Sequence, residues 1–224
     1  MGFVLGLGGK KRSGKDTSAD ILVKEFGYTK LSFGDDLKHL CQAMTGIPLK
    51  NFYEESLKDT KFSSPLVLNK TDLYNNILDY FNKTESLFQP TDEKIAFSSP
   101  REIMQVIGTD IVRKTLFDNN FWITFLSNKI KQIETPVVIA DMRFSHERKF
   151  IKELGGITCR IKREEADGSG DSHSSENDLG EDSEYDFVLL NNGSMSELRS
   201  SVRQLEKLGQ RAYLYGEIKD DSKH

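Results

Sequence analysis

The sequence has few of the residues that build disulfide or zinc scaffolds. Its 224 residues include two cysteines, Cys41 and Cys159, which lie far apart in apolar-periodic stretches and form no C-x-x-C pair. We therefore expect two buried thiols that stay reduced in a reducing compartment. The four histidines are scattered along the chain, which gives no support to a zinc site.

Positive charge and long apolar runs are also lacking. Lys and Arg number 31 against 35 Asp and Glu, a net charge of −4, so no overall positive field is present to hold a nucleic acid. No stretch approaches the roughly 20 apolar residues of a membrane span, and the N-terminus shows no charged-then-apolar signal. The composition, 37% hydrophobic, allows a core of ordinary size. The sequence predicts a cytoplasmic protein without a membrane or nucleic-acid partner.

Short apolar runs alternate along the chain with stretches of helix-like spacing. This order predicts an α/β fold in which helices cover both sides of a parallel sheet. The five expected strands are Gly2–Gly8, Tyr28–Phe33, Val137–Ala140, Ile157–Ile161 and Phe187–Leu190.

The spacing of these strands predicts how the chain is organised. About a hundred residues separate the second and third strands. We therefore interpret the chain as one domain over residues 1–216 with a mostly helical insert at 35–130. The segment 164–186 contains acidic residues, glycines and serines but no Lys or Arg, which is typical of either a mobile lid or a solvated linker. Residues 217–224 are expected to form a flexible tail.

Two Ser-x-x-Glu patterns predict helix N-termini by the capping-box rule. Ser99 would cap a helix that begins with a proline, and Ser194 would cap the final helix. In the first of these helices, Arg101, Gln105 and Gly108 fall on the face opposite the apolar residues. The apolar face is therefore expected to pack on the core.

The strongest signal is a glycine-rich loop between the first expected strand and the first helix. Residues 9–15 fit G-x-x-x-x-G-K, and the flanking strand and helix supply the context that a phosphate-binding loop requires. The glycines let backbone N–H groups turn toward phosphate oxygens, while the Lys15 ammonium reaches the terminal phosphates. A glycine-rich turn that binds no phosphate is the competing interpretation.

The position after Lys15 departs from this pattern. Asp16 stands where Ser or Thr would ligate Mg²⁺, and Thr17 follows it. A carboxylate suits Mg²⁺ but adds negative charge beside the phosphates, so tight nucleotide binding is expected to require the metal. Either Asp16 or Thr17 is the expected metal ligand.

Two charged residues follow the third expected strand, at the edge where parallel sheets bind ligands. Asp141 ends the strand and could hold magnesium or its waters. Arg143 could neutralise charge on a phosphoryl group during its transfer. A surface salt bridge is the alternative for Arg143.

A second nucleotide motif is weaker. The segment 66–72 reads LVLNKTD, which contains the N-K-x-D pattern of guanine-binding switches. Such a switch also needs a D-x-x-G metal loop between the phosphate loop and the base-reading motif, and the sequence has none there. We interpret Thr71 instead as the N-cap of a helix that contains Leu73.

Together the motifs resemble the deoxynucleoside monophosphate kinases of bacteriophage type, in the same order and over most of the chain. The matching blocks are GKKRSGKDTSAD, SPREIMQVIGTDIVR with NNFWITFL, VVIADMRFSHE, DSHSSENDLG and FVLLNNGSMSEL. The resemblance implies a P-loop kinase fold that uses ATP and Mg²⁺ to phosphorylate a deoxynucleoside monophosphate, supplying precursors for DNA synthesis. It also suggests a homodimer, located in the host cytoplasm if the protein is viral.

The resemblance implies roles for residues in three groups. The catalytic residues would be Lys15, Arg143 and Asp141. ATP would contact Lys10, Lys11, Arg12, Ser13, Gly14, Lys15, Asp16 and Thr17, with Asn192 and Gly193 near the adenine. The acceptor nucleotide, bound by the helical insert, would contact Lys38, Arg101, Gly108, Thr109, Trp122, Asp141, Arg143 and Glu147.

Some of these residues have structural alternatives. Arg101 suits a phosphate clamp because it leaves the apolar face of its helix near the N-terminus. Lys38 could instead be solvated beside Asp35, and Trp122 could be a core residue. Residues 46–97 do not align with the family pattern, so the sequence does not identify the preferred base.

Three other functions compete with this one. A phosphomevalonate-type kinase shares a similar S-G-K-D loop and acidic lid and differs in its acceptor. A regulatory GTP-binding module would bind GTP over ATP and turn over slowly without an acceptor. A phosphate-loop protein that only binds its ligand would form no product with any acceptor.

Overall fold

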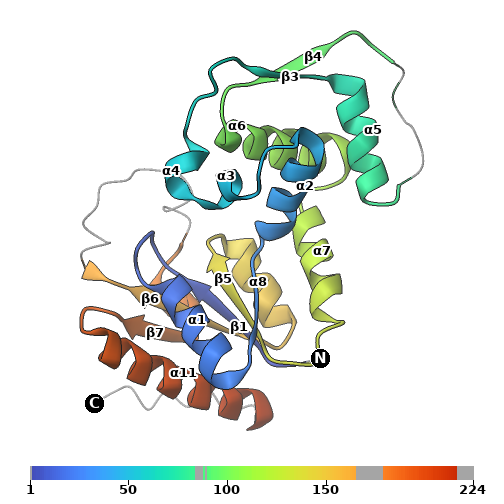
Figure 1. Cartoon of the computed structure of the whole chain (residues 1–224). Helices are drawn as coiled ribbons and strands as arrows, with labels where there is room; N and C mark the ends of the chain where they lie inside the picture. The colour runs from blue at the N-terminus through green and yellow to red at the C-terminus, as the bar shows by residue number, and fades with distance from the viewer. Residues whose placement is uncertain (1, 84–87, 89, 165–178, 216–224) are drawn as a thin grey trace. The chain divides into compact units, whose positions relative to one another are not determined.

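The computed structural model describes residues 2–83, 88, 90–164 and 179–215, and the chain divides into two compact units (Figure 1). The first unit consists of Met1–Phe33 and Leu126–His224, and the second is the intervening segment Gly34–Phe125. The second unit lies within the range 35–130 of the expected insert, apart from its first residue.

A parallel sheet forms the centre of the first unit. Five strands of the described residues make up this sheet, in the order β2-β5-β1-β6-β7. Their bounds are β1 (Val4–Gly8), β2 (Thr29–Leu31), β5 (Val137–Met142), β6 (Ile157–Lys162) and β7 (Phe187–Leu190). In this register Leu5 of β1 lies beside Val138 of β5 and Ile157 of β6. Because the strands are parallel, the loops that follow them share one edge of the sheet.

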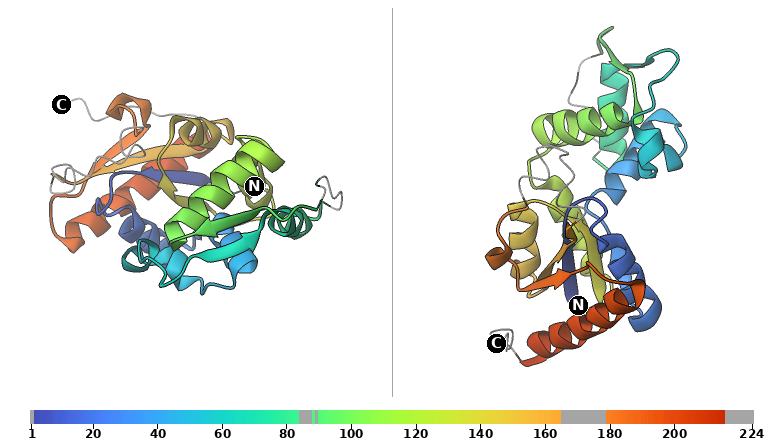
Figure 2. Two further views of the ribbon diagram at one scale, coloured as in Figure 1. Left: turned by 90° about the horizontal axis from the view of Figure 1, so that it is seen from above. Right: turned by 90° about the vertical axis from the view of Figure 1, so that its left-hand side faces the viewer.

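Helices cover both faces of this sheet (Figure 2). Helices α1 (Lys15–Phe26) and α11 (Met195–Tyr215) pack on one face, in a core cluster that contains Leu7, Leu22 and Val202. Helix α8 (Ser145–Glu153) covers the other face so closely that a Cβ at Gly6 would lie 2.3 Å from Ile151 Cδ1. The predicted α/β fold, with a five-stranded parallel sheet between helices, is confirmed.

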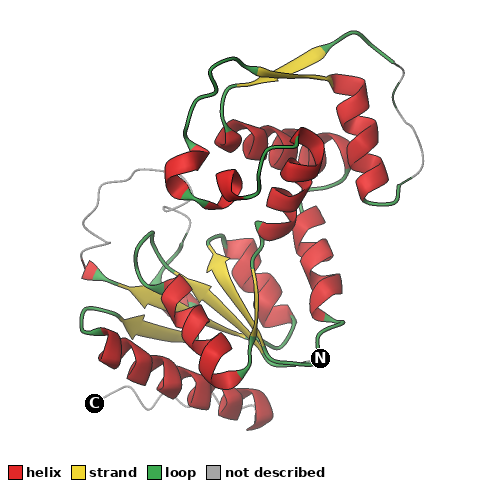
Figure 3. Cartoon of the chain, viewed as in Figure 1, coloured by secondary structure: helices red, strands yellow, loops and turns green. Residues whose placement is uncertain are grey.

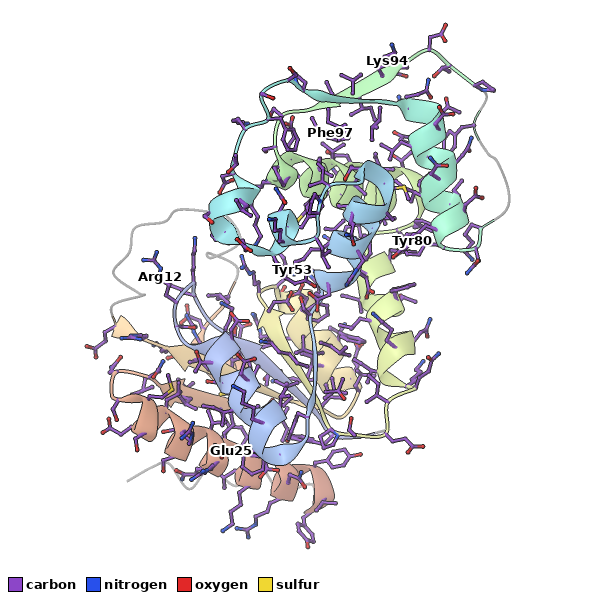
Figure 4. All side chains as sticks on the ribbon, in the orientation of Figure 1. Arg12, Glu25, Tyr53, Tyr80, Lys94 and Phe97 are labelled. Atoms are coloured by element: carbon purple, nitrogen blue, oxygen red, sulfur yellow. The ribbon has the colours of Figure 1, made fainter. Side chains whose placement is uncertain are left out.

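The second unit is mostly helical and has a core of its own (Figure 3). Its helices are α2 (Asp35–Thr45), α3 (Lys50–Tyr53), α4 (Glu55–Lys58), α5 (Lys70–Tyr80), α6 (Pro100–Gln105) and the π-helix η1 (Val106–Leu116). Strands β3 (Leu66–Asn69) and β4 (Lys94–Phe97) pair antiparallel. Phe52 and Phe97 are fully buried in this core, and Phe97 is labelled in Figure 4.

Two short elements complete the description. Helix α7 (Phe121–Ile130) crosses from the second unit into the first, and η2 (Asp182–Glu184) is a single 3₁₀ turn before β7. None of the helices in the described part of the chain is long and apolar enough to cross a membrane. Cys41 and Cys159 are buried free thiols, as predicted, and burial raises the pKa of Cys159 to about 12.

Both predicted serine N-caps are confirmed, but the capping box expected at Ser99 is not closed, because the Glu102 carboxylate accepts from Ser98 N at 2.7 Å. The Ser99 hydroxyl accepts a hydrogen bond from Glu102 N at 3.3 Å, and the Ser194 hydroxyl accepts one from Glu197 N at 3.3 Å. The Ser194 backbone N in turn donates to the Glu197 carboxylate at 2.6 Å, which completes a capping box.

The predicted cap of α5 is wrong. Asn69 Oδ1 accepts from Asp72 N at 3.0 Å and caps the helix, whereas Thr71 is buried and bonds to Thr91. Asn69 precedes the helix and can reach its unbonded N–H groups, while Thr71 already belongs to the first turn. The apolar run before N-K-T-D is strand β3, which pairs with β4.

The helix that starts at Pro100 changes its geometry after Gln105. It continues as a π-helix, whose i→i+5 bonding also appears at its end, where Phe117 N donates to Val112 O at 2.9 Å. Gly108, which the sequence pattern places on the face opposite the apolar residues, is itself buried, and a Cβ there would lie 2.6 Å from Leu37. The wider π turns move the residues after Gln105 off the faces that a 3.6-residue period assigns.

Two predicted segments lie wholly or partly outside the described residues. Of the expected lid at 164–186, the structure describes residue 164 and residues 179–186. The expected tail at 217–224 is not among the described residues.

Candidate functional site

The loop between β1 and α1 has a conformation that its glycines make possible. Gly9 has φ 153° and Gly14 has φ 100°, which favour glycine. A Cβ at Gly9 would lie 2.4 Å from the Ile161 carbonyl oxygen, so no larger residue fits there. Arg12, at the turn of the loop (Figure 4), also has a positive φ of 65°.

Helix α1 begins directly after this loop without a side-chain cap. Gly14 is the N-cap, and it has no side chain to bind the N–H groups of the first turn. The first helical bond runs from Ser18 N to Gly14 O at 2.9 Å. The N–H groups ahead of it and the positive end of the helix dipole form an anion-binding site.

The Lys15 side chain is folded over the loop and is 9% exposed. Its Nζ lies 3.5 Å from Lys10 O and 4.0 Å from the Asp16 carboxylate. These two distances are at the long end of the range for their kind, and a phosphate at the helix N-terminus would offer the ammonium a shorter, charge-assisted hydrogen bond.

The two expected metal ligands differ in exposure. The Asp16 side chain is 71% exposed and pairs with Lys30 at 3.6 Å, while Thr17 is half-buried in the first turn. Within the described residues, no group of three His, Cys, Asp or Glu is arranged to hold a metal. Hydroxyl and carboxylate oxygens fit Mg²⁺, which takes few protein ligands and uses water and phosphate oxygens for the rest.

A cavity of about 220 Å³ adjoins the loop and the N-terminus of α1. Its walls also come from the residues after β6 and β7 and from the start of α11. The lining residues are Arg12, Gly14, Lys15, Asp16, Thr17, Arg163, Asn191, Gly193, Met195 and Leu198. Four of these were missed by the sequence analysis: Arg163, Asn191, Met195 and Leu198. The first two directly follow β6 and β7, whose ends lie at the same edge of the sheet as the phosphate loop.

Asn191 connects the end of β7 to the phosphate loop. Its side chain is buried, and its Nδ2 donates to Ser13 O at 2.8 Å. Its backbone N donates to Lys162 O at 2.7 Å, which anchors the residue to β6. A Cβ at Gly14 would lie 2.3 Å from Asn191 Nδ2, so glycine leaves the space that this amide occupies.

Asn192 and Gly193, both expected near the adenine, have local contacts. Asn192 Nδ2 donates to Glu164 Oε1 at 2.9 Å, and its Oδ1 accepts from Glu164 N at 3.0 Å. A Cβ at Gly193 would lie 2.3 Å from Glu197 Oε2. Gly193 lines the cavity, whereas the Asn192 side chain is held by Glu164.

Asp141 and Glu147 make hydrogen bonds within the first unit. Asp141 accepts from Ser32 Oγ at 2.5 Å and from Phe33 N at 2.9 Å, which ties the end of β5 to the residues after β2. Glu147 is 4% exposed and accepts from Arg143 N at 2.7 Å, at the start of α8. The Arg143 side chain is exposed.

The two expected cations of the second unit have carboxylate partners. Arg101 donates to Asp59 through Nε at 2.5 Å and through Nη2 at 3.0 Å, and to Glu55 at 2.8 Å. The hydrogen bond to Asp59 is the main cause that raises the pKa of Arg101. Lys38 pairs with Asp35 at 3.0 Å and lies 4.1 Å from the centre of the Tyr53 ring.

Trp122 is a buried residue of the second core. It is 4% exposed, and its Nε1 donates to Gly108 O in the π-helix at 3.1 Å. Phe81 and Phe121 contact the indole edge-on, with ring centres 6.1 and 5.2 Å away. Thr109, next to Gly108, is exposed. The structure thus gives Trp122 and Gly108 packing contacts, and their role in acceptor binding stays a prediction.

Arg113, in the same π-helix, is a candidate that sequence reasoning missed. It is half-buried, and its buried Nε has no hydrogen-bond partner among the residues that the structure describes. A buried guanidinium N–H without an acceptor costs free energy that an anionic ligand would recover. The signal was present in the sequence, because Arg113 ends the block SPREIMQVIGTDIVR.

The matching family model and the sequence relatives point to one family. A family model described as deoxynucleotide monophosphate kinase matches residues 54–202. A protein of Acanthamoeba polyphaga mimivirus named for that activity is 30% identical over 210 residues, covering 89% of this chain and 93% of the relative. The deoxynucleotide monophosphate kinase of Escherichia phage RB69 is 28% identical over 241 residues, covering 89% and 97%. Among solved structures, a dephospho-CoA kinase from Campylobacter jejuni is 16% identical with a TM-score of 0.44, covering 94% of this chain and 98% of that one.

Proposed function

Because the chain belongs to the deoxynucleotide monophosphate kinase family, we propose that it transfers the γ-phosphoryl group of ATP to a deoxynucleoside monophosphate. The products are ADP and the deoxynucleoside diphosphate. The observation that carries the proposal is the phosphate loop, in which Lys15 is folded over the uncapped N-terminus of α1.

The donor site is proposed to lie in the first unit. The loop from Lys10 to Gly14 and the first turn of α1 bind the ATP phosphates through backbone N–H groups and the Lys15 ammonium. The adjoining cavity of about 220 Å³ takes the nucleoside part, with Gly193 in its wall. Both Arg12 and Arg163 line this cavity and supply positive charge beside it.

Magnesium is proposed to bind with ATP at the first turn of α1. Thr17 or Asp16 supplies one oxygen, and the metal lowers the repulsion between Asp16 and the phosphates. When bound, Mg²⁺ neutralises charge on the phosphates during transfer.

The acceptor site is proposed to lie in the second unit. Arg113 offers a half-buried guanidinium whose Nε has no hydrogen-bond partner among the residues described. Arg101 and Lys38 must instead exchange carboxylates for the acceptor phosphate. An arginine binds a phosphate through two parallel N–H groups, which gives direction as well as charge. Thr109, an exposed polar residue of the same π-helix as Arg113, is proposed to contribute to this site.

The chemistry needs positioning and charge stabilisation more than a base. A monophosphate dianion is already a competent nucleophile, so no residue has to remove a proton from it. In-line transfer spreads charge over the oxygens of the moving group, where Lys15, the loop N–H groups and Arg143 stabilise it. Asp141 is proposed to assist by fixing the chain after β2, through its bonds to Ser32 and Phe33.

A coupled assay of ADP formation tests the proposal. The purified chain is mixed with ATP, Mg²⁺ and each deoxynucleoside monophosphate in turn, with the ribonucleotides, phosphomevalonate and no acceptor as controls. We expect rapid ADP formation with at least one deoxynucleotide and only slow release without an acceptor. The proposal would be refuted if phosphomevalonate were the only acceptor that is phosphorylated, if slow GTP hydrolysis were the only activity, or if no acceptor gave a product.

A further inference from the structure

We propose that Asn191 is a positioning residue that sets the phosphate loop in the conformation that binds a triphosphate. Asn191 and Ser13 are 178 residues apart in sequence, yet Asn191 Nδ2 donates to Ser13 O at 2.8 Å in a buried contact. The inference deepens the proposed function, because it rests on triphosphate binding at this loop.

The hydrogen bond fixes the direction of one peptide group. In a planar trans peptide the C=O and the N–H point in opposite directions. Holding the Ser13 oxygen therefore also sets the direction of the Gly14 N–H, the donor at the N-cap of α1. In a phosphate loop, this N–H belongs to the row of backbone donors that bind the phosphates.

Local contacts make Asn191 the side chain suited to this task. The Ser13 hydroxyl is buried and has no hydrogen-bond partner within the described part of the chain, so it does not hold the loop itself. Gly14 has φ 100°, where an L side chain is strained and where a Cβ would collide with the Asn191 amide. A flexible glycine peptide thus gains a defined orientation from a buried partner directly after β7.

The backbone of Asn191 is itself fixed by a hydrogen bond to the neighbouring strand β6. Its backbone N donates to Lys162 O at 2.7 Å, and its side chain is 6% exposed. Pre-organised donors cost less free energy on binding than donors that must first be ordered. Removing the amide should therefore weaken binding of the phosphates rather than of the base.

The test measures binding of inorganic tripolyphosphate and of ATP, both with Mg²⁺, to the full chain by calorimetry. Asn191→Leu keeps the approximate size of the side chain and removes the donor, and Asn191→Ser is a smaller second variant. For both we expect the Kd of tripolyphosphate and of ATP to rise by the same factor, about three- to tenfold for one hydrogen bond.

Thr158→Val is the matched control. Thr158 is fully buried in β6 of the same unit, and its Oγ1 donates to Asp186 at 2.8 Å. This variant should lower the melting temperature and leave both Kd values unchanged. An equal loss of tripolyphosphate binding in Thr158→Val would show a general effect of stability and overturn the inference.

Two further outcomes would overturn it. Wild-type affinity for tripolyphosphate in both Asn191 variants would show that the loop does not need the amide. Weaker binding of ATP with unchanged binding of tripolyphosphate would indicate that Asn191 acts on the nucleoside part of ATP instead. Wild-type protein that binds tripolyphosphate but phosphorylates no deoxynucleotide would refute the proposed function alone, and wild-type protein that binds no tripolyphosphate would refute both.

Discussion

The two units hold their positive groups in different ways. In the first unit, the donors at the phosphate loop are backbone N–H groups and Lys15, whose Nζ lies 3.5 Å from Lys10 O and 4.0 Å from the Asp16 carboxylate. In the second unit, Arg101 and Lys38 form close pairs with carboxylates, at 2.5 Å to Asp59 and 3.0 Å to Asp35.

The first site thus uses mainly backbone donors, whereas the second uses charged side chains. A backbone donor is fixed by the fold, as Gly14 is fixed through Ser13 and Asn191, and it carries no net charge that a nearby carboxylate must balance. A long cationic side chain can turn to whichever anion is nearest. We expect the first unit to bind phosphate with little rearrangement, and the second to exchange ion pairs when the acceptor arrives.

The largest expected effect comes from the lysine of the first unit. Lys15→Ala should lower turnover by about 10³-fold, because it removes a cation that stabilises charge on the transferred group. The melting temperature should stay near that of the wild type. Lys24→Ala, an exposed position in the last turn of the same helix, is the control and should keep full turnover in the coupled assay. Unchanged turnover of Lys15→Ala would remove the phosphate loop from the mechanism.

The next effect compares the arginines of the second unit. Arg113→Gln should raise the KM for the acceptor by about 10- to 100-fold, as expected for a charge-assisted hydrogen bond, and leave the KM for ATP unchanged. Arg101→Gln should raise the acceptor KM less, because Asp59 and Glu55 already neutralise this guanidinium.

Removing one carboxylate partner of Arg101 tests whether its ion pair competes with the acceptor phosphate. Asp59→Asn removes the charge that competes with a phosphate for Arg101, so the KM for the acceptor should fall. A rise in KM would mean that the carboxylate orients Arg101 for the ligand rather than competing with it. Initial rates at varied acceptor concentration distinguish the two.

A smaller effect concerns the packing of the second unit. Trp122→Phe loses the hydrogen bond to Gly108 O and part of the buried volume, so the free energy of unfolding should fall by about 1–3 kcal/mol. Denaturant unfolding measures this change. A large rise in the acceptor KM with unchanged stability would instead support the ring as a platform for the base.

The smallest effect is a pH dependence of the two capped helices. Hydrogen bonds from Ser194 lower the pKa of Glu197 below 4.5, and hydrogen bonds from Ser98 do the same for Glu102. A carboxyl group whose pKa is lowered by folding stabilises the fold at pH values above its ordinary pKa. This stabilisation is lost as the pH falls through the lowered pKa. Glu197→Gln and Glu102→Gln should each reduce the melting temperature near neutral pH and weaken its dependence on acidification. Curves of melting temperature against pH that run parallel for the variants and the wild type would contradict this expectation.

Much of the first unit was predictable because its signals are local. Apolar runs and the glycine loop depend on residues close together in sequence, and β1 and α1 agree with the prediction. The Ser-x-x-Glu caps are local signals too, and they agree both for Ser194 in this unit and for Ser99 in the second. The family resemblance, stated from motif blocks, is confirmed by the family model and by the relatives.

The errors and omissions depend on contacts that no local pattern contains. The wide turns of the π-helix placed Gly108 against Leu37, and Arg101 found its partners on α4 and just after it, more than 40 residues away in sequence. Arg113 ends a block that resembles the family, but that pattern does not separate it from the other charged residues of the block; the burial of its Nε in the folded chain does.

The sequence by itself determined the strand, loop and helix that bind phosphate, since glycine torsions and helix N-termini are set by neighbouring residues. Only the tertiary structure decided which side chains hold that loop and which cations are already paired. Those choices depend on residues such as Asn191 and Ser13, or Arg101 and Asp59, which become neighbours only when the chain folds and buries the groups between them.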